Sequence, residues 1–302
     1  MRWMIPASPR STPRSHVAVP PRARGLGRPL SWLGALAMAA LVACGPPLSE
    51  EEAEALDRAD VPHATLGIQS IPTGYYDGAT GKTGTTLLAA LSSRIAAGQR
   101  TMSYDAARDQ LFGAADDTDN DDVVFCVYTG RKAERIRDRG TASGASMNTE
   151  HVWPQSLGAT GGAQADLHHL RGSDIDTNGR RGNYPFGVVV TATWTAPAPD
   201  GAAPSRLGKD AGGRTVFEPH DSTKGDIARS IMYFYTRYNG QPTSKYTTNN
   251  FKVEKSILRK WHEMDPPDAT ERLRNDVVFS IQGNRNPYID HPEYVAAIPD
   301  FN

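Results

Sequence analysis

The stretch that decides the fold runs from residue 148 to residue 187 and contains three motifs. They are Asn148-Thr-Glu-His-Val-Trp-Pro-Gln-Ser156, then Asp166-Leu-His-His-Leu-Arg171, then Asn178-Gly-Arg-Arg-Gly-Asn183-Tyr-Pro-Phe-Gly187. Three of the eight histidines of the chain lie here, with a carboxylate beside one of them and arginines close behind. Hydrolysis of a phosphodiester requires such parts: a base for water, a ligand for a hard metal ion and cations for the phosphate.

The first motif offers a base and a metal ligand side by side. A neutral imidazole titrates near working pH and can activate water, so His151 is the candidate base. Mg²⁺ neutralises phosphoryl oxygens, prefers oxygen ligands and keeps several waters, so Glu150 is the natural ligand and few others are needed. Adjacent strand residues face opposite sides, so both reach one phosphate only where the strand ends or bulges. Pro154 indicates that regular pairing ends nearby.

The second motif predicts a helix. Asp166 is a suitable cap for a helix that begins at Leu167. In such a helix Leu167 and Leu170 share the core face, and His168 and His169 lie on either side of it. A strand, a turn and a helix, with one histidine on the strand and a ligand on the helix, form a ββα-metal arrangement.

The three motifs together resemble the bacterial endonuclease I family, which belongs to the His-Me finger nucleases. The resemblance extends beyond the three motifs and covers about residues 74–296. The further segments that resemble the family are Gly78-Ala-Thr-Gly-Lys82-Thr-Gly84, Phe217-Glu-Pro219, Lys224-Gly-Asp226, Trp261-His262 and Gln282-Gly-Asn-Arg-Asn-Pro287. The resemblance implies an α+β fold, mainly helical, in a single domain around a small ββα-metal core. It also implies an Mg²⁺-dependent endonuclease of little sequence specificity that cleaves DNA, and often RNA, to 5′-phosphate ends.

Carried over residue by residue, the resemblance makes His151 the general base and Glu150 a metal ligand. His169 stands where many members have an asparagine ligand, and we expect this substitution to favour Mn²⁺ as a substitute for Mg²⁺. Some members place a transition-state arginine between the strand and the helix, but residues 152–168 contain no Arg or Lys. That role therefore falls to Arg171, Arg180 or Arg181.

Five more residues are expected to support the site. We expect His168 to assist the ligands rather than bind metal, and Asn178 and Asn183 to fix a loop. Asn148 and Asp166 complete this supporting set.

The N-terminal 44 residues have the features of an export signal. An Arg-containing segment without acidic residues precedes the apolar run Trp32–Ala43, which is too short to span a membrane. The run ends in Leu41-Val-Ala-Cys44, which resembles the bacterial lipobox and makes Cys44 the expected lipidation site. We therefore expect an exported lipoprotein, anchored in the outer membrane or at the cell surface, with an ordinary signal peptide and a secreted protein as the alternative. The segment before the apolar run is unusually long for a signal peptide, so a true start codon downstream of Met1 is a second interpretation.

Charge restricts where a nucleic acid can bind. Residues 1–43 hold six of the 33 basic residues and none of the 34 acidic ones, so the remainder has a formal charge of −7. Residues 45–72 are predicted to be an acidic linker before a nuclease domain at residues 73–298. A surface that binds phosphates must therefore be local. The run Arg131–Arg139 holds five cations. It is either a solvated face or a surface that contacts the phosphate backbone of a nucleic acid.

The remaining pattern predicts mostly helices. The apolar positions Leu87, Leu88, Leu91 and Ile95 indicate a helix from Thr83 that stops at Gly98. The other expectations are a helix capped by Ser103, a polar loop at 116–122, a strand at Val123–Tyr128 with Cys126 in the core, a hairpin or irregular strands within 188–216, helices at Asp221–Tyr238, Val253–Glu263 and Asp268–Gln282, and a polar turn at 284–292.

Two other functions compete with the metal-dependent nuclease. One is a zinc hydrolase that uses His151, His168 and His169, although these do not form the His-x-x-x-His pair of helical zinc sites. The other is a catalytically silent surface lipoprotein that binds nucleic acid. Measuring which metal ion activates the protein, and whether it digests DNA and RNA, distinguishes these three functions. None of the three functions requires an obligate protein partner.

Overall fold

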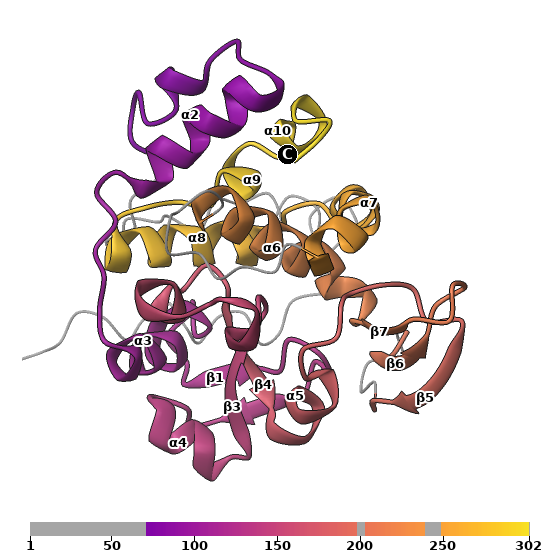
Figure 1. The fold of residues 1–302 in the computed structure, drawn as a ribbon. Helices are drawn as coiled ribbons and strands as arrows, with labels where there is room; N and C mark the ends of the chain where they lie inside the picture. Colours follow the sequence, from indigo (N-terminus) through magenta and orange to yellow (C-terminus); the bar gives the residue numbers. More distant parts are fainter. Residues whose placement is uncertain (1–70, 198–202, 239–248, 302) are drawn as a thin grey trace, which may run out of the picture. The chain divides into compact units, whose positions relative to one another are not determined.

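The computed structural model describes residues 71–197, 203–238 and 249–301 (Figure 1). The predicted signal segment with Cys44, and the linker up to residue 70, lie outside the described residues. Helices and small antiparallel sheets alternate along the described chain, which is an α+β architecture as predicted. No helix within the described ranges has both the length and the apolar character needed to cross a membrane.

Nine α-helices of the described residues carry most of the fold. Their bounds are α2 (Gly84–Ala96), α3 (Tyr104–Gln110), α4 (Arg139–Gly144), α5 (Ile175–Arg181), α6 (Lys224–Tyr238), α7 (Asn249–Met264), α8 (Ala269–Gln282), α9 (Pro287–Asp290) and α10 (Tyr294–Ala297). The strands form three separate sheets: β1 (Val123–Phe125) with β2 (Lys132–Glu134), β3 (Met147–His151) with β4 (Leu170–Asp174), and β5 (Thr191–Thr195) with β6 (Arg206–Lys209) and β7 (Thr215–Glu218).

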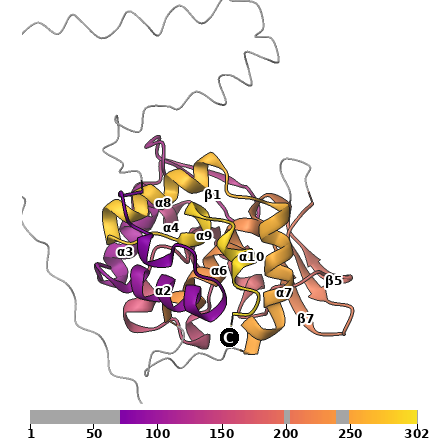
Figure 2. The same cartoon turned by 90° about the horizontal axis from the view of Figure 1, so that it is seen from above.

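Helix α6 lies at the centre of the helical part. It packs against α2, α7 and α9, and α2 covers it in Figure 2. Almost every side chain of α6 is buried, including Arg229 and Ser230 as well as the predicted apolar positions. A helix that is surrounded on all sides belongs to the core, so the apolar stripe seen in the sequence understates its burial.

Local capping signals correctly predicted the ends of several helices. The hydroxyl of Ser103 accepts a hydrogen bond from the amide of Ala106 at the start of α3, and Asp268 accepts one from Glu271 at the start of α8. Gly283 ends α8 with a φ of 80°, a left-handed conformation that favours glycine. The four predicted leucine and isoleucine positions of α2 are all buried.

The predicted helix at Leu167 is wrong. Residues 161–165 form a short 3-10 helix, residues 167–169 form a turn, and strand β4 begins at Leu170. Asp166 does not cap a helix, because its carboxylate accepts hydrogen bonds from Tyr233, Tyr238 and Gln282 as well as from the amide of His168. Leu167 and Leu170 are both buried, but a turn leading into a buried strand produces the same spacing.

The helix that follows the β3–β4 pair is α5, which begins directly after Asp174. Strands β3 and β4 are antiparallel, with Glu150 opposite Arg171 and His151 opposite Leu170. The order strand, strand, helix therefore occurs at residues 147–181, with the third motif on the helix. Figure 1 shows these elements together below the layer of α6 and α8.

Two further expectations need correction. The strand predicted for Val123–Tyr128 is shorter, since β1 ends at Phe125, although Cys126 is buried as expected. The segment 284–292 is not a polar turn throughout, because Pro287–Asp290 form α9 and Asn284, Arg285 and Asn286 before it are buried. Their polar groups are satisfied internally, for example by the ion pair of Arg285 with Asp290.

Candidate active site

A surface groove of about 410 Å³ joins the first and third motifs. It is lined by Thr149, Glu150, His151, Pro154, Gln155, Ser156, Asn178, Gly182 and Asn183. These residues come from the end of β3, the short helix η4 (Gln155–Leu157) and the C-terminal half of α5 with its following loop. The second motif lies behind the groove, because His168 and His169 are buried and do not line it.

His151 is held in one tautomer. Its Nε2 lies 3.0 Å from the carbonyl oxygen of Gln164, which can only accept, so Nε2 carries the proton. The lone pair is then on Nδ1, which lies 3.2 Å from the amide nitrogen of Gln155. The same amide nitrogen also lies 3.2 Å from Nε2, so Gln155 contacts the edge of the ring, and the Gln164 carbonyl alone decides the tautomer.

The environment keeps His151 neutral. Burial, followed by the neighbouring His169 and the charge of Arg181, lowers the pKa of His151 to about 3. The ring of His169 lies 5.5 Å from that of His151. At neutral pH the imidazole is therefore uncharged, with its lone pair on Nδ1.

Glu150 is almost completely buried, yet it lines the groove. The hydroxyl of Tyr128 donates to its Oε1 at 2.8 Å, and Arg181 Nε lies 3.2 Å from the same oxygen. Burial raises the pKa of Glu150, and the charge of Arg181 opposes that rise. Glu150 and His151 both reach the groove because β3 ends at His151, as the position of Pro154 predicted.

Asn178 lies on helix α5, where it contacts β3. Its side-chain nitrogen donates to Asn148 Oδ1 at 2.9 Å and to the carbonyl of Thr149 at 3.2 Å. The amide oxygen must then point the other way, and it receives no hydrogen bond from the described residues. Asn148 thus supports Asn178, which lines the same groove as Glu150.

The candidate arginines lie outside the groove lining. Arg181 is buried and donates to the carbonyls of Val152 and Gly182 at 2.6 Å each, besides its ion pair with Glu150. Arg171 is buried and lies 3.8 Å from Asp226 on α6. Arg180 is exposed, with its guanidinium 6.0 Å from the ring of Trp194. None of these three side chains lines the groove that contains His151.

His169 does not lie on a helix, so the structural premise for its predicted ligand role is wrong. It is fully buried, Nε2 donates to the carbonyl of Ala163 at 2.7 Å, and its ring packs edge-on against Phe234. His168 donates to the carbonyl of Asn284 at 3.0 Å. The three histidines of the zinc alternative do not converge: within the described residues, the only group of three candidate metal ligands is Asp117, Asp119 and Asp121.

The model of the family described as Endonuclease I matches residues 83–293, which include every residue of the groove. The chain belongs to the endonuclease I family. It is therefore a nuclease, an enzyme that hydrolyses phosphodiesters.

Curated proteins similar to this endonuclease I family member are nucleases as well. An extracellular ribonuclease of Bacillus subtilis (strain 168) is 35% identical over 239 residues, which is 74% of this chain and 77% of the relative. An extracellular deoxyribonuclease of Aeromonas hydrophila is 26% identical over 132 residues, or 42% of this chain and 49% of the relative. An endonuclease-1 of Buchnera aphidicola subsp. Acyrthosiphon pisum (strain APS) is 27% identical over 126 residues, which is 42% of this chain and 44% of the relative.

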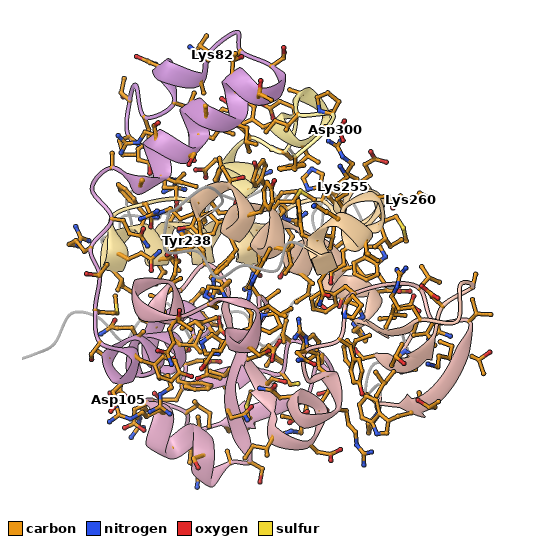
Figure 3. The ribbon with its side chains drawn as sticks, viewed as in Figure 1. Lys82, Asp105, Tyr238, Lys255, Lys260 and Asp300 are labelled. Carbon is orange, nitrogen blue, oxygen red and sulfur yellow. The ribbon has the colours of Figure 1, made fainter. Side chains whose placement is uncertain are left out.

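Three residues near His151 of this endonuclease I family member were not predicted from the sequence. Gln155 lies inside the first motif, where its position could have been noted. Tyr104 and Arg108 come from α3, whose sequence carried only a helical pattern. The ring of Tyr104 lies 5.4 Å from that of His151, and the guanidinium of Arg108 lies 4.8 Å from the centre of the Tyr104 ring. Arg108 also pairs with Asp105, which Figure 3 labels on the same helix.

Proposed function

We propose that the protein is a metal-dependent endonuclease with little sequence specificity, in which His151 is the general base and Glu150 and Asn178 hold Mg²⁺. One observation carries the proposal: the neutral imidazole of His151, the carboxylate of Glu150 and the amide of Asn178 all line one groove. A base and hard oxygen ligands around a surface groove are the combination that metal-assisted phosphodiester hydrolysis requires.

The donor set fits a hard divalent cation. Glu150 contributes a carboxylate, and Asn178 contributes an amide oxygen that receives no hydrogen bond from the described residues. Mg²⁺ requires few protein ligands because it retains waters, and Mn²⁺ accepts the same oxygen ligands. When bound, such an ion would neutralise charge on the phosphate oxygens and supply an acidic water for the leaving group. His169 is not a ligand in this proposal, because its side chain is buried and does not line the groove.

The residues of the chain perform the remaining tasks. The carbonyl of Gln164 fixes the tautomer of His151, so that Nδ1 takes the proton of the attacking water, which replaces the contact of Nδ1 with Gln155. Arg181 opposes the rise in the pKa of Glu150 and so favours its ionised form. Arg108 is the arginine that we assign to the substrate phosphate, because it is partly exposed and stacks on Tyr104, whose ring lies 5.4 Å from that of His151.

Substrate and location follow from the relatives and from the sequence. Relatives named ribonuclease and deoxyribonuclease support nucleic acid as the substrate, and we propose that both DNA and RNA are cleaved to 5′-phosphate ends. Relatives named extracellular support export. Lipidation of Cys44 is a separate proposal that rests on the sequence alone, and release of a Cys44→Ser variant from the membrane fraction tests it.

Digestion of plasmid DNA and of a long RNA by the purified protein tests the function. We expect cleavage with Mg²⁺ or Mn²⁺, none after EDTA, and recovery when Mg²⁺ is restored in excess. Activity that returns only with Zn²⁺ would favour a zinc hydrolase. Binding of nucleic acid without cleavage under any metal would favour a silent binding protein.

A further inference from the structure

Tyr184 presents an aromatic ring to solvent at the edge of the groove. Its side chain follows Gly182 and Asn183, which both line the groove, and the residue is 40% exposed. A Cβ atom placed on Gly182 would lie 3.8 Å from two carbons of the Tyr184 ring, so the ring lies beside the groove wall. The described residues provide no aromatic partner for this ring and no hydrogen bond to its hydroxyl.

The backbone beneath this ring is fixed from several sides. The side chain of Asn183 donates to the hydroxyl of Ser156 across the groove at 3.3 Å, and Asn250 of α7 donates to the Asn183 carbonyl at 3.3 Å. The amide of Phe186 donates to the buried carboxyl of Glu254 at 2.8 Å. Tyr184 is therefore held between two anchored residues, although its own side chain makes no contribution to that anchoring.

An exposed ring on a fixed backbone is suited to bind a flat partner. Ordering the backbone beneath the ring in advance removes part of the entropy that binding would otherwise cost. In the adjacent groove, the proposed base and metal ligands act on a phosphate. The nucleotide that carries that phosphate places its base within a few ångströms of the backbone, and aromatic side chains bind bases by stacking.

We propose that Tyr184 stacks on an unpaired base next to the scissile phosphate, which makes the groove preferentially a site for single-stranded nucleic acid. This inference rests on the proposed nuclease function. A base in a duplex is already stacked on both faces, so it must leave the helix before it can contact Tyr184. Every base has an aromatic face, so the contact adds affinity for single strands without adding sequence preference.

Steady-state kinetics on matched oligonucleotides test the proposal. The substrates are one sequence as single-stranded RNA, as single-stranded DNA and as a DNA duplex. Tyr184→Ala should raise KM for both single strands by at least about fivefold and leave KM for the duplex unchanged. Tyr184→Phe keeps the ring and should retain the wild-type KM. The control is Phe125→Ala, which removes an exposed ring on β1, outside the groove, and should change no KM.

A binding measurement separates this inference from the nuclease proposal. A single-stranded oligonucleotide with 2-aminopurine in place of one base is mixed with the full-length protein in EDTA, and its fluorescence is followed. Wild type and Tyr184→Phe should quench the fluorescence by stacking, and Tyr184→Ala should bind with much less quenching. If wild type cleaves single strands but Tyr184→Ala matches it in KM and quenching, the stacking role is wrong and the nuclease function stands. If wild type cleaves no substrate, the nuclease proposal fails, and the quenching alone decides the stacking role.

Discussion

Arg181 and Glu150 form a buried ion pair, with Arg181 Nε 3.2 Å from Glu150 Oε1 and both side chains at most 3% exposed. The pair connects α5 to β3, and the hydrogen bond from Arg181 to the Val152 carbonyl strengthens that connection. The proposed metal ligands Glu150 and Asn178 lie on these two elements. The ion pair therefore fixes the distance between the two ligands together with the hydrogen bonds from Asn178 to β3.

Replacement of Arg181 by Met should lower the free energy of unfolding by about 3–5 kcal/mol, because it leaves the carboxylate of Glu150 buried and unpaired. Glu150 should then be protonated more easily, which weakens metal binding. Urea unfolding and calorimetric titration with Mn²⁺ measure the two effects. The neighbouring Arg180→Met removes an exposed pair with Asp176 and a 6.0 Å contact with the ring of Trp194, and should cost less than about 1 kcal/mol. Equal stability of the two variants would contradict the structural role of Arg181.

Asn178 and His169 should differ in their effect on metal dependence. Asn178→Ala removes a proposed oxygen ligand and should raise the Mg²⁺ concentration for half-maximal rate by at least about tenfold. Asn178→Asp supplies another oxygen and should retain metal binding. His169→Ala leaves a cavity beside Phe234, so it should lower stability but keep the Mg²⁺ requirement. The opposite pattern, with metal dependence altered only by His169→Ala, would restore His169 as the ligand.

Arg108 should contribute to substrate binding rather than to folding. Arg108→Ala removes a cation close to His151 and should lower kcat/KM by roughly tenfold, with a shallower dependence of KM on salt concentration. Arg94→Ala is a matched control, since Arg94 also stacks on a tyrosine, 3.8 Å from the centre of the Tyr75 ring, but lies on α2 outside the groove. An equal loss of kcat/KM in both variants would show that the effect comes from losing an arginine stacked on a tyrosine and not from the position of Arg108 near His151.

His168 should make stability sensitive to acid. Burial, only partly offset by Asp166, lowers the pKa of His168 to about 4 from an ordinary value of 6.5. Between these values the unfolded chain binds more protons than the folded chain, so stability falls as pH falls from 6.5 to 4. Glu254 acts in the opposite direction, since burial raises its pKa to about 7 from 4.5 and its contribution favours folding at lower pH.

A His168→Gln variant isolates this contribution. Urea midpoints of variant and wild type are compared at intervals between pH 4 and pH 8. The difference between them should shrink as pH falls through the window, by on the order of 3 kcal/mol in total, because the variant has no imidazole to protonate. A constant difference at all pH values would show that His168 does not titrate in this range.

The sequence predicted those parts of the fold that depend on neighbouring residues. Ser103 and Asp268 cap helices through amides three residues away, so their signals are local. The turn before β4 was mispredicted because Asp166 bonds to α6 and α8 rather than to the next turn, which no local pattern reveals. Glu150 and His151 were singled out because they are adjacent in a motif. Arg108 was missed because only tertiary packing places α3 beside them.

The base assignment is the central claim, and the single-turnover rate of the His151→Ala variant tests it most directly. Nucleic-acid substrate is mixed with excess protein and Mg²⁺, and cleavage is followed by rapid quench alongside a measurement of substrate affinity. The account predicts a rate lower by about 10²–10⁴-fold with an unchanged Kd, because His151 activates water and does not bind the substrate backbone. A folded His151→Ala protein that cleaves at close to the wild-type rate would contradict it.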